Sequence, residues 1–342
     1  MKILYAVQAT GNGHISRAKQ LLPYLLKYGS VDCFVSGANY SLNPEFSVKY
    51  KSRGVSLFYA KCGKIDFMKS VYKNNIFTAI QDARRLPVEK YDVIINDFES
   101  ITALACRLKN KQSVSIGHQA SFMSEKTPRP QEKSRLGEMI LSHYARCTHY
   151  IGLHFRRYDE FIFEPIIKEE IKRANPIDKG HITIYLPSYK IDCLKGSLLS
   201  IPELHFHFFT HETNTIYKEK NITFYPINND YFSKSMIECH GLITGGGFET
   251  PSEALYLNKK LLSIPIQGQY EQLCNATALS MLGVPVITNF DYTKFDTYIR
   301  QWMSLKDKKI QILANNIPLM LESIFDNLNQ KFEYSENFEN TF

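Results

Sequence analysis

The stretch LITGGGFETPSEAL, residues 242–255, places three consecutive glycines between an apolar run and an amphipathic one. Residues 241–244 have the composition of a buried strand, and residues 249–257 have the apolar spacing of a helix. The glycines at 245–247 would then expose backbone N–H groups at a helix N-terminus, where the helix dipole favours a phosphate. No Gly-Lys-Ser/Thr follows, so this is not a P-loop. The stretch predicts an open α/β sheet with a ligand site at its carboxyl edge.

The rest of the chain repeats this alternation of short apolar runs and helical stretches in two halves. Such alternation predicts parallel sheets covered by helices on both faces. We therefore predict an α/β fold of two tandem, doubly wound Rossmann-like domains that face each other across a cleft. The expected strands are 3–7, 31–35, 55–59, 91–96, 113–116, 150–153, 181–186, 204–209, 222–225, 241–244 and 260–264. The expected helices are 16–27, 66–86, 100–108, 132–147, 249–257, 270–281 and further helices within 293–328.

A charged and aromatic segment with Pro165 and Pro176 separates the two halves and predicts an interdomain linker. The predicted division is an N-terminal domain over 1–155, a linker over 156–178, a C-terminal domain over 179–325 and a tail over 326–342 that packs back on the N-terminal domain.

Length and composition exclude several classes of protein. At 342 residues the chain is too long for one ordinary domain, and 44% hydrophobic with 22% charged residues is unlike a disordered, collagenous or coiled-coil protein. No apolar run approaches the ~18 residues of a membrane-spanning helix, and the run at the N-terminus is too short for a signal peptide. Seven widely spaced cysteines without a C-x-x-C pair suggest neither a disulfide framework nor a zinc site, and they fit a reducing cytoplasm.

The net charge of +7 is divided unevenly along the chain. Residues 1–173 carry 27 Lys/Arg against 16 Asp/Glu, whereas residues 174–342 carry 14 against 18. A basic half suits an anionic membrane surface, a nucleic acid or an anionic substrate. Nucleic acid is the weakest of the three because no nucleic-acid-binding signature accompanies the charge. The alternative is that the two halves simply drifted apart in charge.

The first strand ends in a Gly11-x-Gly13-His14 turn before the next helix. Two glycines there allow close approach of a ligand to the backbone. A dinucleotide is disfavoured, because Ser16 stands where a third glycine is needed and no carboxylate follows the second strand. His14 lies in the turn at the ligand edge of the sheet. It is either a structural residue or a catalytic one.

Asp97 follows the strand expected at 91–96 and favours the catalytic reading of His14. If that strand neighbours the first one, the two residues face each other across one sheet edge. A carboxylate that accepts the imidazole N–H fixes the tautomer and raises the basicity of the other nitrogen. The alternative is that Asp97 caps the helix that begins at Ser100.

In the second half, Glu253 lies one turn into the helix after the glycines. It is placed to accept two hydroxyls of a ribose, or it only favours the helix dipole. The segment after the next strand is rich in amides suited to sugar hydroxyls, namely Gln267, Gln269, Gln272 and Asn275.

These motifs together resemble a GT-B glycosyltransferase, in the branch of inverting enzymes that use UDP-sugars and the peptidoglycan-type N-acetylglucosaminyltransferases. The resemblance spans roughly residues 2–285. It rests on Gly11-x-Gly13-His14-x-x-Arg17, on Asp97, and on Gly245-Gly246-Gly247, Ser252-Glu253-Ala254, Pro265, Gln267, Gln272 and Asn275-Ala276.

The resemblance implies a nucleotide sugar in the C-terminal domain and an acceptor in the N-terminal one. The residues that it implies for the donor are Gly13, Ile227, Thr244, Gly245, Gly246, Gly247, Phe248, Glu249, Ser252, Glu253, Gln267, Gln269 and Gln272. Those for the acceptor are Gly11, Asn12, Arg17 and His118. The family often has an acid–amide pair where this chain has Gln267-Gly268-Gln269, which leaves the donor sugar open, hexosyl or N-acetylhexosaminyl. The family's base-recognition stretch matches Tyr225-Pro226-Ile227 only weakly.

An inverting reaction is expected for two reasons. Retaining GT-B enzymes commonly carry two glutamates separated by seven residues near the glycines, but eight positions after Glu249 and Glu253 stand Leu257 and Leu261. Inversion needs one base, for which His14 is the candidate. The glycine N–H groups would stabilise the leaving diphosphate, and no Asp-x-Asp motif occurs, so no metal and no cofactor are expected.

Two other classes stay open at this stage. A UDP-sugar 2-epimerase would need further carboxylates, for which the chain offers Asp97, Glu99, Glu249 and Glu253. A non-catalytic subunit would use the pocket only for binding. If His14 is not the base, Glu99 or His118 is the next candidate. A lipid-linked acceptor at the inner face of the cytoplasmic membrane would suit the basic half, and a small soluble acceptor would also fit.

Overall fold

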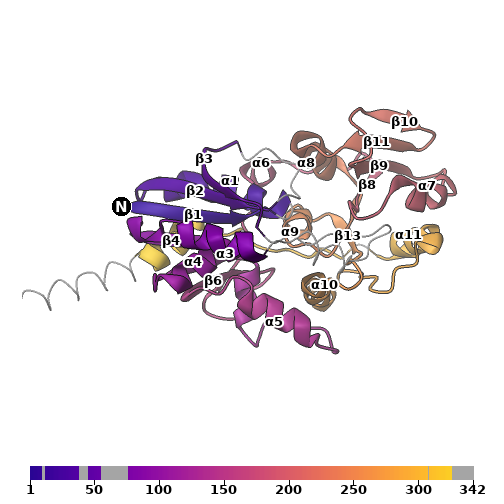
Figure 1. The fold of residues 1–342 in the computed structure, drawn as a ribbon. Helices are drawn as coiled ribbons and strands as arrows, with labels where there is room; N and C mark the ends of the chain where they lie inside the picture. The colour runs from indigo at the N-terminus through magenta and orange to yellow at the C-terminus, as the bar shows by residue number, and fades with distance from the viewer. Residues whose placement is uncertain (10–11, 38–44, 55–75, 307, 326–342) are drawn as a thin grey trace, which may run out of the picture.

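The chain folds into two parallel sheets, each covered by helices and joined by the segment between β7 and β8 (Figure 1). The structure, a computed structural model, describes residues 1–9, 12–37, 45–54, 76–306 and 308–325. The two Rossmann-like domains lie side by side, with α9 between them in Figure 1. The predicted α/β class and two-sheet arrangement are confirmed.

The N-terminal sheet has seven parallel strands in the order β3-β2-β1-β4-β5-β6-β7. Its strands are β1 (Lys2–Gln8), β2 (Ser30–Ser36), β3 (Val48–Ser52), β4 (Val93–Asp97), β5 (Val114–Gly117), β6 (His149–Leu153) and β7 (Ile162–Phe163). Its helices are α1 (Asn12–Leu25), α3 (Ile76–Arg85), α4 (Ser100–Leu108) and α5 (Arg135–His143), with short 3-10 turns at Val88–Lys90 and Gln119–Met123.

The C-terminal sheet has six strands in the order β10-β11-β9-β8-β12-β13, and only β10 is antiparallel to its neighbour. Its strands are β8 (His181–Tyr185), β9 (His205–Thr210), β10 (Tyr217–Glu219), β11 (Ile222–Pro226), β12 (Gly241–Thr244) and β13 (Lys260–Ser263). Its helices are α7 (Ile191–Leu199), α8 (Asn229–Glu238), α9 (Glu249–Tyr256), α10 (Tyr270–Leu282) and α11 (Phe295–Ser304), with a 3-10 turn at Tyr292–Lys294.

Several elements differ from the sequence-based expectations. The strand expected at 55–59 and the first ten residues of the helix expected at 66–86 lie outside the described residues. Helices α7 and α8 and strand β10 were not predicted. Helix α1 begins at Asn12, four residues before the expected start, so His14 lies in the first helical turn and not in the preceding loop.

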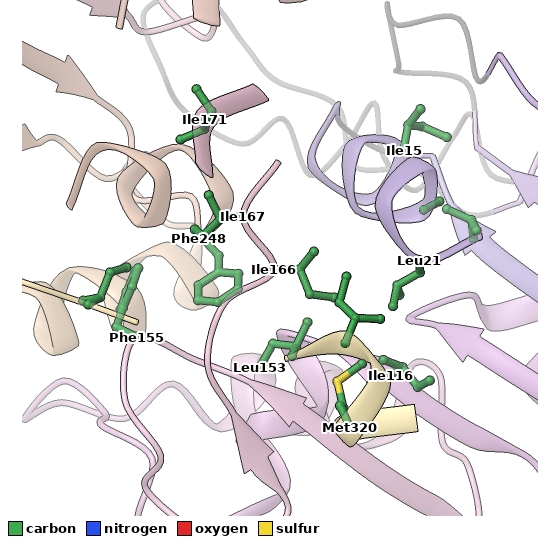
Figure 2. Close-up of a cluster of buried hydrophobic side chains, with 14 of the residues drawn as sticks. Ile15, Leu21, Ile116, Leu153, Phe155, Ile166, Ile167, Ile171, Phe248 and Met320 are labelled. Atoms are coloured by element: carbon green, nitrogen blue, oxygen red, sulfur yellow. The ribbon is translucent and has the colours of Figure 1, made fainter. Parts of the chain in front are cut away.

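The segment expected as an extended linker over 156–178 contains β7 and the short helix α6 (Glu169–Lys172). Strand β7 extends the N-terminal sheet past residue 155, because it pairs with β6. Between the two elements, Ile166 and Ile167 pack into the main hydrophobic cluster with Ile15 of α1 and with Phe248 (Figure 2). Apolar burial on this scale fixes the linker backbone between the domains.

The last described residues return to the N-terminal domain. After α11 the chain crosses back, and the helix over 317–325 lies beside the N-terminal sheet (Figure 1). Phe325 stacks on Tyr28 with ring centroids 3.9 Å apart, and the N–H of Asn315 donates to the carbonyl of Pro165 at 2.8 Å. The tail predicted over 326–342 lies outside the described residues.

The structure also shows the state of the cysteines and whether a described helix could span a membrane. Five cysteines of the described chain are free and buried, namely Cys33, Cys106, Cys147, Cys239 and Cys274. Cys193 is disulfide-bonded, a bond that the wide cysteine spacing did not suggest. Within the ranges that the structure describes, no helix is long and apolar enough to cross a membrane.

A pair of stacked histidines lies under α8 in the C-terminal domain. The rings of His181 and His207 are 3.7 Å apart, and both face the hydroxyl of Ser235, at 3.2 Å and 2.9 Å. Burial lowers the pKa of both imidazoles, and the neighbouring His181 contributes to lowering the pKa of His207 to about 4. Protonation would place a charge on the buried His181 or on the partly buried His207.

This pair predicts a loss of stability in mild acid. The pKa of histidine is ~6.5 in the unfolded chain and about 4 at His207 in the folded protein. The unfolded state therefore binds the proton first as the pH falls. The free energy of unfolding decreases as the pH drops from the higher pKa toward the lower one. Urea unfolding of the wild type at about pH 7.5 and about pH 5 should show this loss. His207→Phe should reduce it, whereas His205→Phe, at an exposed position of the same strand, should not. Equal pH dependence in His207→Phe and wild type would contradict the assignment.

Candidate functional site

The pairing of β1 with β4 brings His14 and Asp97 together. The two strands are parallel neighbours with Val7 opposite Asp97, so α1 begins beside the carboxyl end of β4. The Nδ1 atom of His14 lies 2.8 Å from Oδ1 of Asp97. The condition on which the sequence argument depended, that these strands are adjacent, is met. Asp97 is completely buried, while His14 stays partly accessible.

Asp97 is not the cap of α4, because Glu99 has that position. The Glu99 carboxylate accepts the N–H groups of Ile101 and Thr102 at 2.8 Å and 2.6 Å, and the hydroxyl of Ser36 donates to it at 2.6 Å. Burial raises the pKa of Glu99 despite these hydrogen bonds. Its oxygens are engaged and away from solvent, so Glu99 is a poor alternative base.

Arg17 was predicted to bind the acceptor, and that role stays a prediction. Its guanidinium is buried and donates to both oxygens of Asp97, from Nε at 2.9 Å and from Nη2 at 2.6 Å. Its Nη1 donates to Glu249 in the C-terminal domain. Burial alone would raise the pKa of Asp97, but the charges of Arg17 and His14 outweigh it and lower that pKa. Arg17 therefore keeps Asp97 ionised and links the two domains.

Close packing requires glycine at position 246, which meets backbone, and favours it at position 13, which meets the end of the Glu249 side chain. A Cβ on Gly13 would lie 2.6 Å from Oε2 of Glu249, and a Cβ on Gly246 would lie 2.7 Å from the carbonyl oxygen of Gln272. The first glycine lets the start of α1 approach the start of α9. The second lets the glycine loop pack on α10.

A pocket of about 250 Å³ lies between the two domains, beside this network. The N-terminus of α1 forms one wall and the N-terminus of α9 another, so two helix dipoles favour an anion there. The lining residues are Asn12, Gly13, Ser16, Lys168, Tyr185, Phe209, Ile227, Asn228, Asn229, Phe232, Gly247, Phe248, Glu249, Thr250, Glu253 and Gln272.

Gln272, which lines the pocket, and Ser252, which does not, brace the glycine loop. Oε1 of Gln272 accepts the N–H groups of Gly246 at 3.1 Å and of Ile266 at 2.9 Å, and the hydroxyl of Ser252 donates to the carbonyl of Phe248 at 2.8 Å. The further predicted residues without a place in the lining are Thr244, Gly245, Gln267 and Gln269. The predicted residue Gly11 lies outside the described part of the chain.

His118 was predicted to contact the acceptor, and that role stays a prediction. Its side chain is buried, with Nδ1 2.9 Å from the carbonyl of Leu153 and Nε2 2.6 Å from Oδ1 of Asn275. Its ring stacks on Phe248 with centroids 4.1 Å apart. Both nitrogens are occupied, and burial lowers its pKa, so His118 braces the domain interface and is no replacement base.

Glu253 is buried at the wall of the pocket and has a partner that sequence reasoning missed. Nζ of Lys168 lies 3.2 Å from its Oε2. Burial raises the pKa of Glu253, and Lys168 opposes that effect without cancelling it. The only sequence signal for Lys168 is its place directly after Ile166 and Ile167, since a lysine within an apolar run suggests a buried stem.

The described side chains do not form a metal site. No group of three or more His, Cys, Asp or Glu residues within the described ranges is arranged to hold a metal ion. The sequence expectation of a reaction without metal stays a prediction.

Comparison with known proteins identifies the class. Residues 1–301 match the family model of glycosyl transferase family 1, so the chain belongs to that family. No curated protein sequence matches it. The fold is that of the GT-B glycosyltransferases, and the earlier resemblance is confirmed.

Three solved structures illustrate the likeness. LpCGTa in complex with UDP has a TM-score of 0.62 at 12% identity, over 96% of this chain and 99% of that one. Arabidopsis thaliana UGT89C1 complexed with quercetin has a TM-score of 0.56 at 11% identity, over 96% of this chain and 98% of that one. Acinetobacter baumannii MurG has a TM-score of 0.51 at 13% identity, over 89% of this chain and 90% of that one. At these identities the likeness defines the fold.

The Arg17 network predicts a large stability effect. Arg17→Met would leave the buried Asp97 carboxylate without its cation, at a cost of about 3–5 kcal/mol in the free energy of unfolding. Urea unfolding near neutral pH measures this. Arg300→Met is the matched control, because Arg300 pairs with Glu203 on the exposed surface and should cost less than about 1 kcal/mol. Similar losses in the two variants would show that Arg17 does not hold the network together.

Proposed function

We propose that this protein is an inverting glycosyltransferase that moves a sugar from a UDP-sugar to an acceptor hydroxyl, with His14 as the general base. The observation that carries the proposal is the His14–Asp97 pair beside an interdomain pocket built on two helix N-termini. Membership of a glycosyltransferase family supports sugar transfer.

The tautomer of His14 follows from its neighbours. A carboxylate only accepts, so Asp97 favours a proton on Nδ1. Arg17 Nη2 lies 2.9 Å from the same nitrogen, but its donation is directed to Asp97 at 2.6 Å. The Nε2 lone pair of His14 is then free to take the acceptor's hydroxyl proton. The acceptor oxygen bonds to the anomeric carbon as the bond from that carbon to the diphosphate oxygen breaks.

The donor is assigned to the C-terminal side of the pocket. Glu253 would accept the ribose hydroxyls, and the backbone of Gly247 with the side chain of Thr250 would face the diphosphate at the start of α9. The apolar wall of Phe209, Ile227 and Phe232 suits a nucleobase. One structural neighbour is a complex with UDP, which supports uridine as the base. Gln267 and Gln269 stay candidates for the sugar.

The same geometry disfavours the 2-epimerase alternative. An epimerase needs accessible carboxylates for acid and base, but Asp97 is held by Arg17, Glu99 caps α4 and Glu253 is buried against Lys168. Glu249 is the remaining carboxylate that lines the pocket, and it accepts a hydrogen bond from Nη1 of Arg17. One base in a polar pocket fits direct displacement better than a pair of acid–base groups.

The catalytic assignment predicts a selective loss of turnover. Once a thermal-shift screen has identified the donor, its slow hydrolysis without acceptor provides an assay. His14→Ala should lower turnover by about 10²–10⁴-fold, because a positioned base contributes about that factor, with little change in UDP affinity. Asp97→Asn should cause a smaller loss, and the double variant should be hardly worse than His14→Ala. Melting temperatures control for unfolding. Wild-type turnover by folded His14→Ala protein would reject the mechanism.

For the acceptor side, we propose an anionic membrane surface as the place of action, on the inner face of the membrane. The N-terminal domain exposes large apolar side chains on the neighbouring helices α3 and α4 and on α5, namely Phe77, Leu108, Leu136, Met139 and Ile140. An apolar hollow between α3, α4 and the end of α5 is edged by Arg107 and Arg146. In the described part of the chain neither arginine pairs with a carboxylate, so both charges are available to lipid phosphates. A lipid-linked acceptor would meet the cleft there, although Asn12 also suits a small acceptor.

Vesicle flotation tests this surface. The wild type should float with vesicles that contain anionic lipid and not with neutral ones, and it should release as salt rises, since screening acts within about 10 Å at 0.1 M. The double variant Arg107→Glu/Arg146→Glu should lose this binding. Lys218→Glu/Lys234→Glu, on the C-terminal domain, should keep it. Equal recovery of wild type with anionic and neutral vesicles would favour a soluble acceptor.

A further inference from the structure

Lys168 is a fixed cation of the interdomain pocket, although it comes from the linker. Its side chain is mostly buried, lines the pocket and ends 3.2 Å from Glu253. The linker backbone on either side is held by Ile167 and Ile171, both fully buried (Figure 2). The lysine is thus aimed into the pocket by packing of its neighbours, at the cost of the rotamer entropy of a long side chain.

The charges around the pocket show which cation a diphosphate can use. Two carboxylates, Glu249 and Glu253, line it together with Lys168. Arg17 is close to these carboxylates but does not line the pocket. Its Nε, Nη1 and Nη2 atoms already donate to Asp97 and Glu249. Lys168 has one carboxylate partner for an ammonium group with three N–H donors. Among the described lining residues it is the cation with donors to spare.

We propose that Lys168 is the catalytic residue that binds the donor's diphosphate and stabilises the charge that develops on it as the sugar leaves. The proposal rests on the proposed function. In the free protein Lys168 neutralises Glu253. When the donor enters, the ribose hydroxyls donate to Glu253, and this allows the ammonium group to turn to the phosphate oxygens.

The exchange keeps every buried charge compensated. Glu253 replaces one ammonium contact by two hydroxyl contacts, and Lys168 replaces a carboxylate by a phosphate. As the bond from the anomeric carbon to the diphosphate oxygen breaks, negative charge grows on the phosphate, so the lysine contact strengthens in the transition state. The N-terminus of α9 supplies the second, fixed contact to the same group.

Comparing the binding of uridine and UDP separates the roles of Lys168 and Glu253, because both ligands carry the ribose but only UDP carries the diphosphate. Calorimetric titration of Lys168→Met should show a UDP dissociation constant raised about 10-fold or more, as for a lost charge-assisted hydrogen bond, with no weakening of uridine. Glu253→Gln should weaken uridine more than UDP, because it removes the ribose contact and frees Lys168. Lys168→Arg should restore most of the UDP affinity.

Lys172→Met is the matched control, since Lys172 lies in helix α6, which directly follows Lys168, pairs with Glu169 and does not line the pocket. Its dissociation constants should equal those of the wild type. Melting temperatures identify unfolded variants, and Lys168→Gln replaces Lys168→Met if the latter does not fold.

The outcomes are distinct. UDP binding by Lys168→Met at wild-type strength, or equal weakening of uridine and UDP, would overturn the proposal and leave Lys168 as a structural partner of Glu253. If the wild type binds neither uridine nor UDP, the proposed function itself fails, and the role of Lys168 fails with it.

Discussion

The buried guanidinium of Arg17 is the interaction on which the site depends. It binds both oxygens of Asp97 at the end of β4 and reaches Glu249 at the start of α9, so one side chain orients the His14–Asp97 pair and joins the two domains. A buried carboxylate without such a partner would be neutral or destabilising. Because Arg17 keeps Asp97 ionised, His14 can be held in one tautomer at the edge of the pocket.

The rest of the domain interface supports this contact. His118 stacks on Phe248 and reaches Asn275, and the linker isoleucines fill the space between α1 and the glycine loop (Figure 2). The helix over 317–325 packs against the N-terminal domain after the chain has completed the C-terminal one. Polar contacts, apolar packing and chain connectivity therefore act on the same interface, and the pocket exists only where both domains meet.

Four acidic side chains near one another have four different tasks, and their surroundings decide which. Asp97 is held ionised by a guanidinium, Glu99 caps a helix, Glu249 joins the domains and Glu253 faces an ammonium group inside the pocket. The same chemical group is thus structural in one position and available to a ligand in another. Burial raises the pKa of Glu99 and Glu253, whereas the opposing charges prevail at Asp97.

The sequence by itself determined the α/β class, the two-domain repeat, the glycine loop at a helix N-terminus and the position of Asp97 at a strand end, because apolar periodicity and strand–helix junctions are local properties of the chain. It did not distinguish Asp97 from Glu99 as the cap of α4, and it did not show that Arg17 and His118 are buried with partners of their own. Helices α7 and α8 were missed because their local patterns are weak beside the strands that they cover.

The tertiary structure alone decided which side chains pair: Arg17 contacts Glu249, 232 residues away in the sequence, and Lys168 contacts Glu253, 85 residues away. Such pairs depend on how two separately folded sheets approach each other, and no local pattern encodes that distance.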